Sequence, residues 1–120
     1  MPSFRALPLL AVLVLPVPVR PDEPKKEPPA RAVARLVHYS GRVQGVGFRA
    51  TAVEIASGYP VTGWVKNLAD GRVELLVEGP EEDVMKFLQA VRTRWKGNIE
   101  KEQIEAKEPS GKYRGFVVER

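Results

Sequence analysis

The chain has 120 residues, enough for one small domain, and it contains no cysteine and one histidine, His38. Disulfides, thiolate catalysis and metal sites built on cysteines or several histidines are therefore excluded. The formal net charge of +4 is shared evenly between the first 32 residues and the rest. We therefore expect no dense basic face and no nucleic-acid partner.

The first 32 residues differ in composition from the rest, because they hold eight of the 11 prolines. The uncharged stretch from Ala6 to Val19 is too short and too rich in proline for a good membrane-spanning helix, but it suits the apolar region of a secretory signal. Residues 21–29 are charged and proline-rich, which is typical of a disordered linker. We predict a signal-like segment over 1–32 and a folded domain over 33–120.

This division predicts an exported protein, periplasmic or secreted, or one tethered to a membrane, with any membrane contact confined to residues 6–19. The alternative is a start codon assigned too far upstream of a cytoplasmic domain.

Alternating and helical periods predict the first half of the domain. Residues 35–40 are typical of a short strand. From Phe48 the apolar residues recur with a helical period, which ends before Gly58 and Pro60. A second strand is expected over 61–66, a turn over 67–71, and a third strand over 72–78, where apolar and charged residues alternate.

The second half begins with Pro80 at the first position of a helix whose first turn is acidic, which favours the positive end of the helix dipole. A charged edge strand over 99–106 and a short strand over 116–119 follow. The order β-α-β-β-α-β is the split β-α-β arrangement. It predicts an α+β, ferredoxin-like fold, an antiparallel sheet with both helices on one face.

The segment from Gly41 to Arg49 contains three glycines between the first strand and the first helix. Glycine allows successive backbone N–H groups to face one point, and a helix N-terminus adds unpaired N–H groups. Arg49 adds a guanidinium whose two N–H groups match a pair of phosphate oxygens. This pattern predicts binding of a small phosphate-like anion without a metal.

Two motifs carry a resemblance to a known family. They are Gly41-x-Val43-Gln44-Gly45-Val46-x-Phe48-Arg49, and Gly63-Trp64-Val65-Lys66-Asn67 followed by Gly71-x-Val73 and Gly79. The domain from about Leu36 onward resembles acylphosphatase, a small ferredoxin-like enzyme that hydrolyses acyl phosphates. Tyr39 departs from the family, which usually has an aliphatic residue there, and we interpret it as a packing substitution.

The resemblance implies a catalytic pair, Arg49 and Asn67, and a phosphate site made by the backbone of Gln44, Gly45, Val46, Gly47, Phe48 and Arg49. It also implies a small-molecule acyl phosphate as substrate, no cofactor and no metal, and we expect a monomer. In this interpretation Asn67 orients the attacking water. We expect Trp64 and Trp95 to make core or helix–sheet contacts.

Two other functions share this topology. A non-catalytic domain that binds phosphate or carbamoyl phosphate is the first, since acylphosphatase-like modules occur in larger carbamoyl-transfer proteins. A single-strand RNA-binding module is the second, but it requires exposed aromatic residues on adjacent central strands, and that pattern is missing from the sequence.

Overall fold

The computed structural model describes residues 31–120. The predicted export segment 6–19 and the linker 21–29 lie outside the described residues. No helix in the described part is long and apolar enough to span a membrane. In chain order the elements are β1 (Ala32–Gly41), α1 (Phe48–Ala56), β2 (Thr62–Asn67), β3 (Val73–Pro80), α2 (Glu81–Arg94), β4 (Ile99–Lys107) and β5 (Phe116–Val118).

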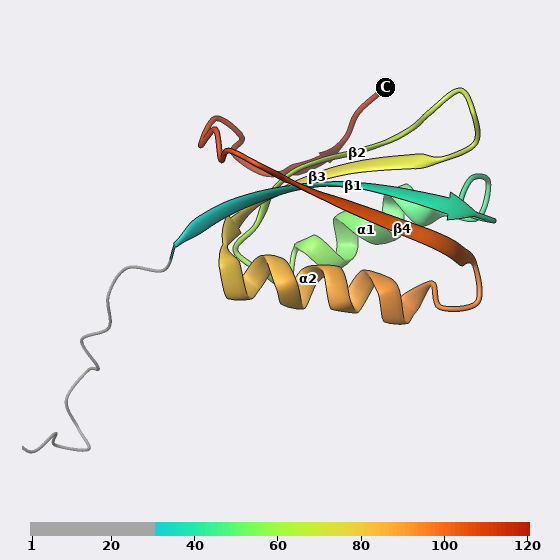
Figure 1. The fold of residues 1–120 in the computed structure, drawn as a ribbon, viewed down its shortest axis with the longest axis horizontal. Coiled ribbons are helices and arrows are strands. Elements are labelled where there is room, and N and C mark those ends of the chain that lie inside the picture. Colours follow the sequence, from blue (N-terminus) through green and yellow to red (C-terminus); the bar gives the residue numbers. More distant parts are fainter. Residues whose placement is uncertain (1–30) are drawn as a thin grey trace, which may run out of the picture.

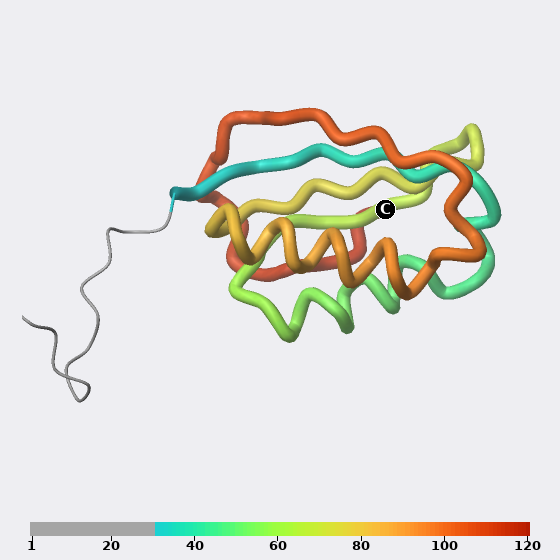
Figure 2. Tube along the Cα trace, turned by 60° about the horizontal axis from the view of Figure 1, so that its bottom comes forward, coloured from blue at the N-terminus to red at the C-terminus, as the bar shows by residue number. Residues whose placement is uncertain are grey.

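The strands form one five-stranded sheet in the order β4-β1-β3-β2-β5, and both helices cover one of its faces (Figures 1 and 2). The ferredoxin-like α+β fold is therefore confirmed. The expected antiparallel sheet needs one correction, because β5 pairs with β2 in parallel. The sheet is mixed, since the connection after β4 returns the chain to the far edge before β5 begins.

Strand directions place three strand ends together. Both β1 and β2 run antiparallel to β3, so they run parallel to each other, and β5 runs parallel to β2. The carboxyl ends of β1, β2 and β5 consequently lie at the same end of the sheet.

Alternation along the strands explains the core. Val37, Val65 and Leu75 are fully buried on the helix-bearing face, where they meet Phe87 and Val91 of α2. Burying a side chain of this size contributes roughly 1.5–3 kcal/mol, so this single layer between sheet and helices holds the domain together.

Most boundaries differ from the predicted ones by one or two residues, and two of the differences have a clear structural reason. Strand β1 begins at Ala32, three residues before the expected start, because Ala32 still pairs with Pro80 of β3. Pro80 itself has an extended ψ of 139° and caps α2, so the helix begins at Glu81. Glu81 N–H donates to the carbonyl of Arg31 at 2.9 Å.

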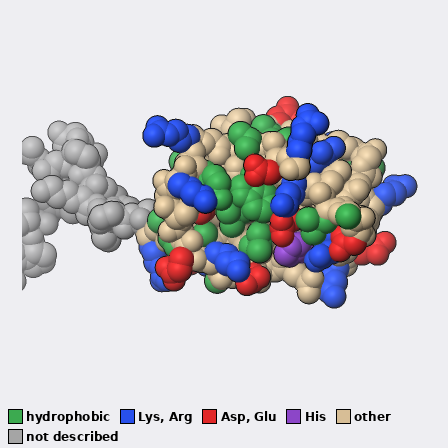
Figure 3. Space-filling model, turned by 90° about the horizontal axis from the view of Figure 1, so that it is seen from above, with side chains coloured by type: hydrophobic (Ala, Val, Ile, Leu, Met, Phe, Trp, Pro, Cys, Tyr) green, Lys and Arg blue, Asp and Glu red, His purple; other side chains and the backbone are tan. Residues whose placement is uncertain are grey.

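The face of the sheet away from the helices carries an apolar patch bordered by charged side chains (Figure 3). The register aligns Leu36, Leu76, Trp64 and Val117 across four strands. Trp64 therefore lies outside the core, contrary to the prediction, whereas Trp95 is buried as expected. The central pair β1 and β3 presents leucines in this row, not the aromatic residues that RNA binding requires.

Candidate active site

The loop between β1 and α1 is shaped by two glycines in left-handed conformations. Gly45 has φ 76° and Gly47 has φ 89°, and Gly47 precedes the first residue of α1. A Cβ atom at either position would meet nothing within 4 Å. The glycines are thus required for the backbone conformation, which costs other residues about 1–2 kcal/mol, and not for lack of space.

This conformation leaves a row of backbone donors at the start of α1. The first helical hydrogen bond runs from Thr51 N–H to the carbonyl of Gly47 at 3.0 Å. Within the described residues, the backbone N–H groups of residues 44–50 have no acceptor. Such groups, together with the positive end of the helix dipole, favour binding of an anion.

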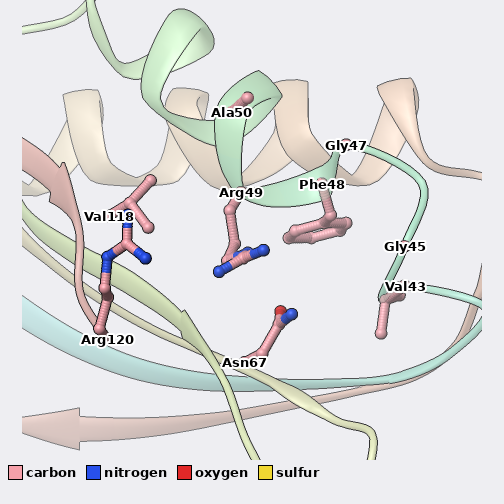
Figure 4. Close-up of a pocket in the computed structure, with 9 residues that line it drawn as sticks. All are labelled: Val43, Gly45, Gly47, Phe48, Arg49, Ala50, Asn67, Val118 and Arg120. Atoms are coloured by element: carbon pink, nitrogen blue, oxygen red, sulfur yellow. The ribbon is translucent and has the colours of Figure 1, made fainter.

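A cavity of about 350 Å³ opens in front of this loop. Arg49 enters it from the first turn of α1, and Asn67 faces it from the end of β2 (Figure 4). Its lining contains no Asp or Glu and consists of Val43, Gly45, Gly47, Phe48, Arg49, Ala50, Asn67, Val118 and Arg120. The cavity is consequently positive and suited to a dianion such as a phosphoryl group.

Asn67 brings an unpaired acceptor to this cavity. Its Oδ1 atom is buried and has no hydrogen-bond partner among the described residues. A buried acceptor that lacks a donor is costly, commonly about 1–3 kcal/mol. Because the Asn67 side chain lines the cavity, a small rotation of its amide would let this oxygen accept a hydrogen bond from a bound water molecule.

The Gln44 side chain fixes the loop relative to Asn67. Its Nε2 atom donates to the carbonyl oxygens of Leu68 at 2.8 Å and Arg72 at 2.9 Å. These two carbonyls flank the turn that follows Asn67. The same two residues are also joined by a hydrogen bond from Leu68 N–H to the carbonyl of Arg72 at 2.8 Å. Gln44 therefore ties together two segments that are 24 residues apart.

An aromatic cluster packs against Phe48, the first residue of α1. Phe48 stacks on Trp95 with ring centroids 5.3 Å apart and lies 5.1 Å from Tyr39. Burial raises the pKa of the Tyr39 phenol far above its usual value, and the nearby Glu102 carboxylate raises it further. That carboxylate is hydrogen bonded to Arg92. Tyr39 Oη approaches the same carboxylate but forms no hydrogen bond of good geometry among the described residues.

Most of the predicted site residues meet in the cavity. Gly45, Gly47, Phe48, Arg49 and Asn67 line it. Two predicted residues do not line the cavity. The Gln44 side chain is hydrogen bonded to the turn, and the Val46 side chain, which belongs to the loop, is 37% exposed.

Sequence reasoning missed Val118 and Arg120, which complete one wall. Only the parallel direction of β5 brings them there, and neither belongs to a motif.

No group of three or more His, Cys, Asp or Glu residues within 31–120 is arranged to hold a metal ion. His38 lies on β1, and its Nε2 atom is 2.8 Å from Oε2 of Glu74 on the neighbouring strand β3.

Comparison with known proteins gives a consistent result. Residues 36–118 match the Acylphosphatase family. An acylphosphatase of Nostoc sp. is 40% identical over 100 residues, which cover 81% of this chain and 96% of that protein. The crystal structure of acylphosphatase from Bacillus subtilis matches with a TM-score of 0.66 and 31% identity, covering 73% of this chain and 99% of that chain.

A larger protein also contains a similar segment. Full-length HypF, in its phosphate- and nucleotide-bound form, matches with a TM-score of 0.64 and 27% identity, and the match covers 79% of this chain but 13% of HypF.

Proposed function

Because this chain belongs to the acylphosphatase family and is an acylphosphatase enzyme, we propose that its cavity hydrolyses small acyl phosphates without a metal. The carboxyl–phosphate bond is broken, and the products are a carboxylate and inorganic phosphate. The single observation that carries the proposal is the convergence of Arg49, Asn67 and the glycine loop on one positive cavity.

The phosphoryl group binds to the loop. Backbone N–H groups of residues 44–49 and the guanidinium of Arg49 donate to its oxygens. Because charge spreads over these oxygens in the transition state, fixed donors stabilise that state most strongly. Arg49 serves better than lysine would, since its planar group donates two parallel hydrogen bonds.

Asn67 orients the nucleophile. Its buried Oδ1 atom accepts a hydrogen bond from a water molecule, which attacks phosphorus opposite the acyl oxygen. The phosphorus–oxygen bond to the acyl group breaks, and the electron pair leaves with the carboxylate. The water's proton passes to a phosphoryl oxygen of the substrate.

The leaving group explains why so few side chains are needed. A carboxylate is a stable anion, so it departs without protonation by a general acid. Positioning and charge stabilisation then supply most of the acceleration.

The test is hydrolysis of benzoyl phosphate by the purified protein with and without EDTA. We expect turnover to be unaffected by EDTA. Arg49→Lys should lower kcat/KM by about 100-fold, equivalent to the ~3 kcal/mol that one such contact contributes. The matched control is Arg114→Lys, on the exposed connection before β5, which should behave as wild type.

Asn67→Ala separates the orientation of the water by Asn67 from the binding of phosphate by the loop and Arg49. The turnover number should fall sharply, because Asn67 is proposed to hold the water. The inhibition constant of inorganic phosphate should stay within about threefold of the wild-type value, because Asn67 is not proposed to bind phosphate. An equal loss of phosphate affinity would show that these assigned roles are wrong, and wild-type turnover in Arg49→Lys would refute the proposed site.

The similarity to a segment of HypF favours one alternative, a domain that binds phosphate or carbamoyl phosphate without catalysis. If this alternative is right, calorimetry should detect binding of phosphate, and the protein should hydrolyse neither benzoyl phosphate nor carbamoyl phosphate.

We also propose that residues 6–19 direct the protein to a membrane or across it, and that the catalytic domain acts there as a monomer. Cell fractionation tests the first statement, since recovery of uncleaved protein from the cytoplasm would refute it. Light scattering tests the second.

A further inference from the structure

The pairing of β5 with β2 directs the end of the chain toward the cavity that Asn67 and Arg120 both line. Val118 pairs with Val65, and Glu119 N–H donates to the carbonyl of Val65 at 2.9 Å. Two residues further along these parallel segments come Asn67 and Arg120. Alternation places Arg120 on the same face as Val118 and Phe116, so its side chain reaches the cavity.

The segment before β5 is anchored as well. The buried carboxylate of Glu78 accepts hydrogen bonds from Ser110 N–H at 3.1 Å, Ser110 O–H at 2.9 Å and Gly111 N–H at 3.0 Å. Gly63 N–H donates to the carbonyl of Gly115 at 2.9 Å. The wall that carries Arg120 is thus attached to the sheet at several points.

The two arginines enter the cavity from different walls. Arg49 comes from α1, whereas Arg120 comes from the far end of β5 beside Val118 (Figure 4). No carboxylate of the described residues forms an ion pair with Arg120. Its guanidinium is available to a ligand.

The cavity is larger than a phosphoryl group needs. Its volume of about 350 Å³ is roughly ten times the ~30 Å³ that one water molecule occupies in the liquid. A phosphoryl group bound to the loop and Arg49 leaves space for an acyl chain of a few carbons, which extends toward Val118 and Arg120.

We propose that Arg120 determines substrate specificity by binding a second anionic group on the acyl part of the substrate. This inference rests on the proposed function. A guanidinium pairs with a carboxylate through two parallel hydrogen bonds, so the preferred substrates are acyl phosphates whose acyl chain ends in a carboxylate. A chain with a plain methyl end gains nothing from Arg120.

The experiment compares succinyl phosphate with butyryl phosphate, two four-carbon substrates that differ in the terminal carboxylate. We expect wild type to prefer succinyl phosphate, and Arg120→Gln to lower kcat/KM about tenfold more for succinyl than for butyryl phosphate, mainly through KM. Arg120→Lys should recover part of the preference, since it retains the charge. Arg114→Gln is the matched control and should leave both substrates unchanged.

Equal losses for the two substrates would overturn the proposal, because they would place Arg120 on the phosphoryl group. No loss for either substrate in Arg120→Gln would overturn it as well, because Arg120 would then not contact the substrate.

A binding measurement separates this inference from the proposed function. Calorimetry with the non-hydrolysable succinyl and butyryl phosphonates reports on Arg120 without turnover. If wild type binds both phosphonates and hydrolyses neither acyl phosphate, the proposed catalysis fails. Tighter binding of succinyl phosphonate that Arg120→Gln removes would still support Arg120, and equal binding of the two would overturn it.

Discussion

Replacing Gln44 tests whether the loop and Asn67 must be held in a fixed relative position. Gln44→Glu keeps the size of the side chain but removes both Nε2 donors and places a carboxylate against the carbonyls of Leu68 and Arg72. Gln44→Ala removes the donors without adding charge. Both variants leave Arg49 and Asn67 intact, so any loss of activity arises from their positions.

The two hydrogen bonds of Gln44 determine how much stability the substitution should remove. Two hydrogen bonds at about 1 kcal/mol each predict that Gln44→Ala lowers the free energy of unfolding by ~2 kcal/mol. For a domain of this size the melting temperature should then fall by roughly 8–16 °C. The Leu68 and Arg72 carbonyls each retain one hydrogen bond within the turn, so the turn itself should survive. Gln44→Glu should cost more, since it adds repulsion.

The assay is thermal unfolding combined with benzoyl phosphate turnover well below the lowered melting temperature. We expect kcat/KM to fall about tenfold in Gln44→Ala and further in Gln44→Glu, while the exposed Gln103→Ala on β4 changes neither quantity. Gln44→Glu with wild-type kcat/KM would refute the reasoning, because the loop would then keep its position without the side chain.

Three further predictions concern stability. Tyr39→Phe should keep or raise the melting temperature, because the buried hydroxyl forms no hydrogen bond of good geometry within residues 31–120; a fall of several degrees would show that its approach to Glu102 is a stabilising hydrogen bond. Gly47→Ala should lower the free energy of unfolding by about 1–2 kcal/mol through left-handed strain, measured by urea titration, and a neutral result would contradict the strain argument. Hydrogen bonds from Arg72 lower the pKa of Asp70, so this ionised carboxylate stabilises the fold above its unfolded pKa of ~3.9, and that contribution is lost as the pH falls through the folded value. The melting-temperature difference between wild type and Asp70→Asn should therefore shrink below about pH 4, and a constant difference would exclude this linkage.

The sequence predicted the parts of the site that depend on local chemistry. The glycine loop and Arg49 could be predicted because left-handed backbone and an anion-binding helix start require particular residues near one another in the chain. Asn67 could be placed because the β-α-β order returns the second strand to the first loop. These inferences need only short-range spacing and one topological rule.

Other features depend on long-range register, which spacing does not reveal. The sequence indicated a backbone role for Gln44, but its side-chain contacts depend on a turn 24 residues away. Trp64 was expected in the core, yet its strand presents Gly63 and Val65 to the helices and Trp64 to the other face. A strand with apolar residues on both faces gives no periodic signal for choosing between them.

The direction of β5 has the largest consequence for the site. Because β5 runs parallel to β2, its carboxyl end reaches the same end of the sheet as the loop and Asn67. An antiparallel β5 would point Arg120 toward the opposite end, and the cavity would lose the wall formed by Val118 and Arg120. In the proposed mechanism the loop and Arg49 bind the phosphoryl group and Asn67 orients the water, so this short strand is the element that we propose distinguishes one acyl group from another.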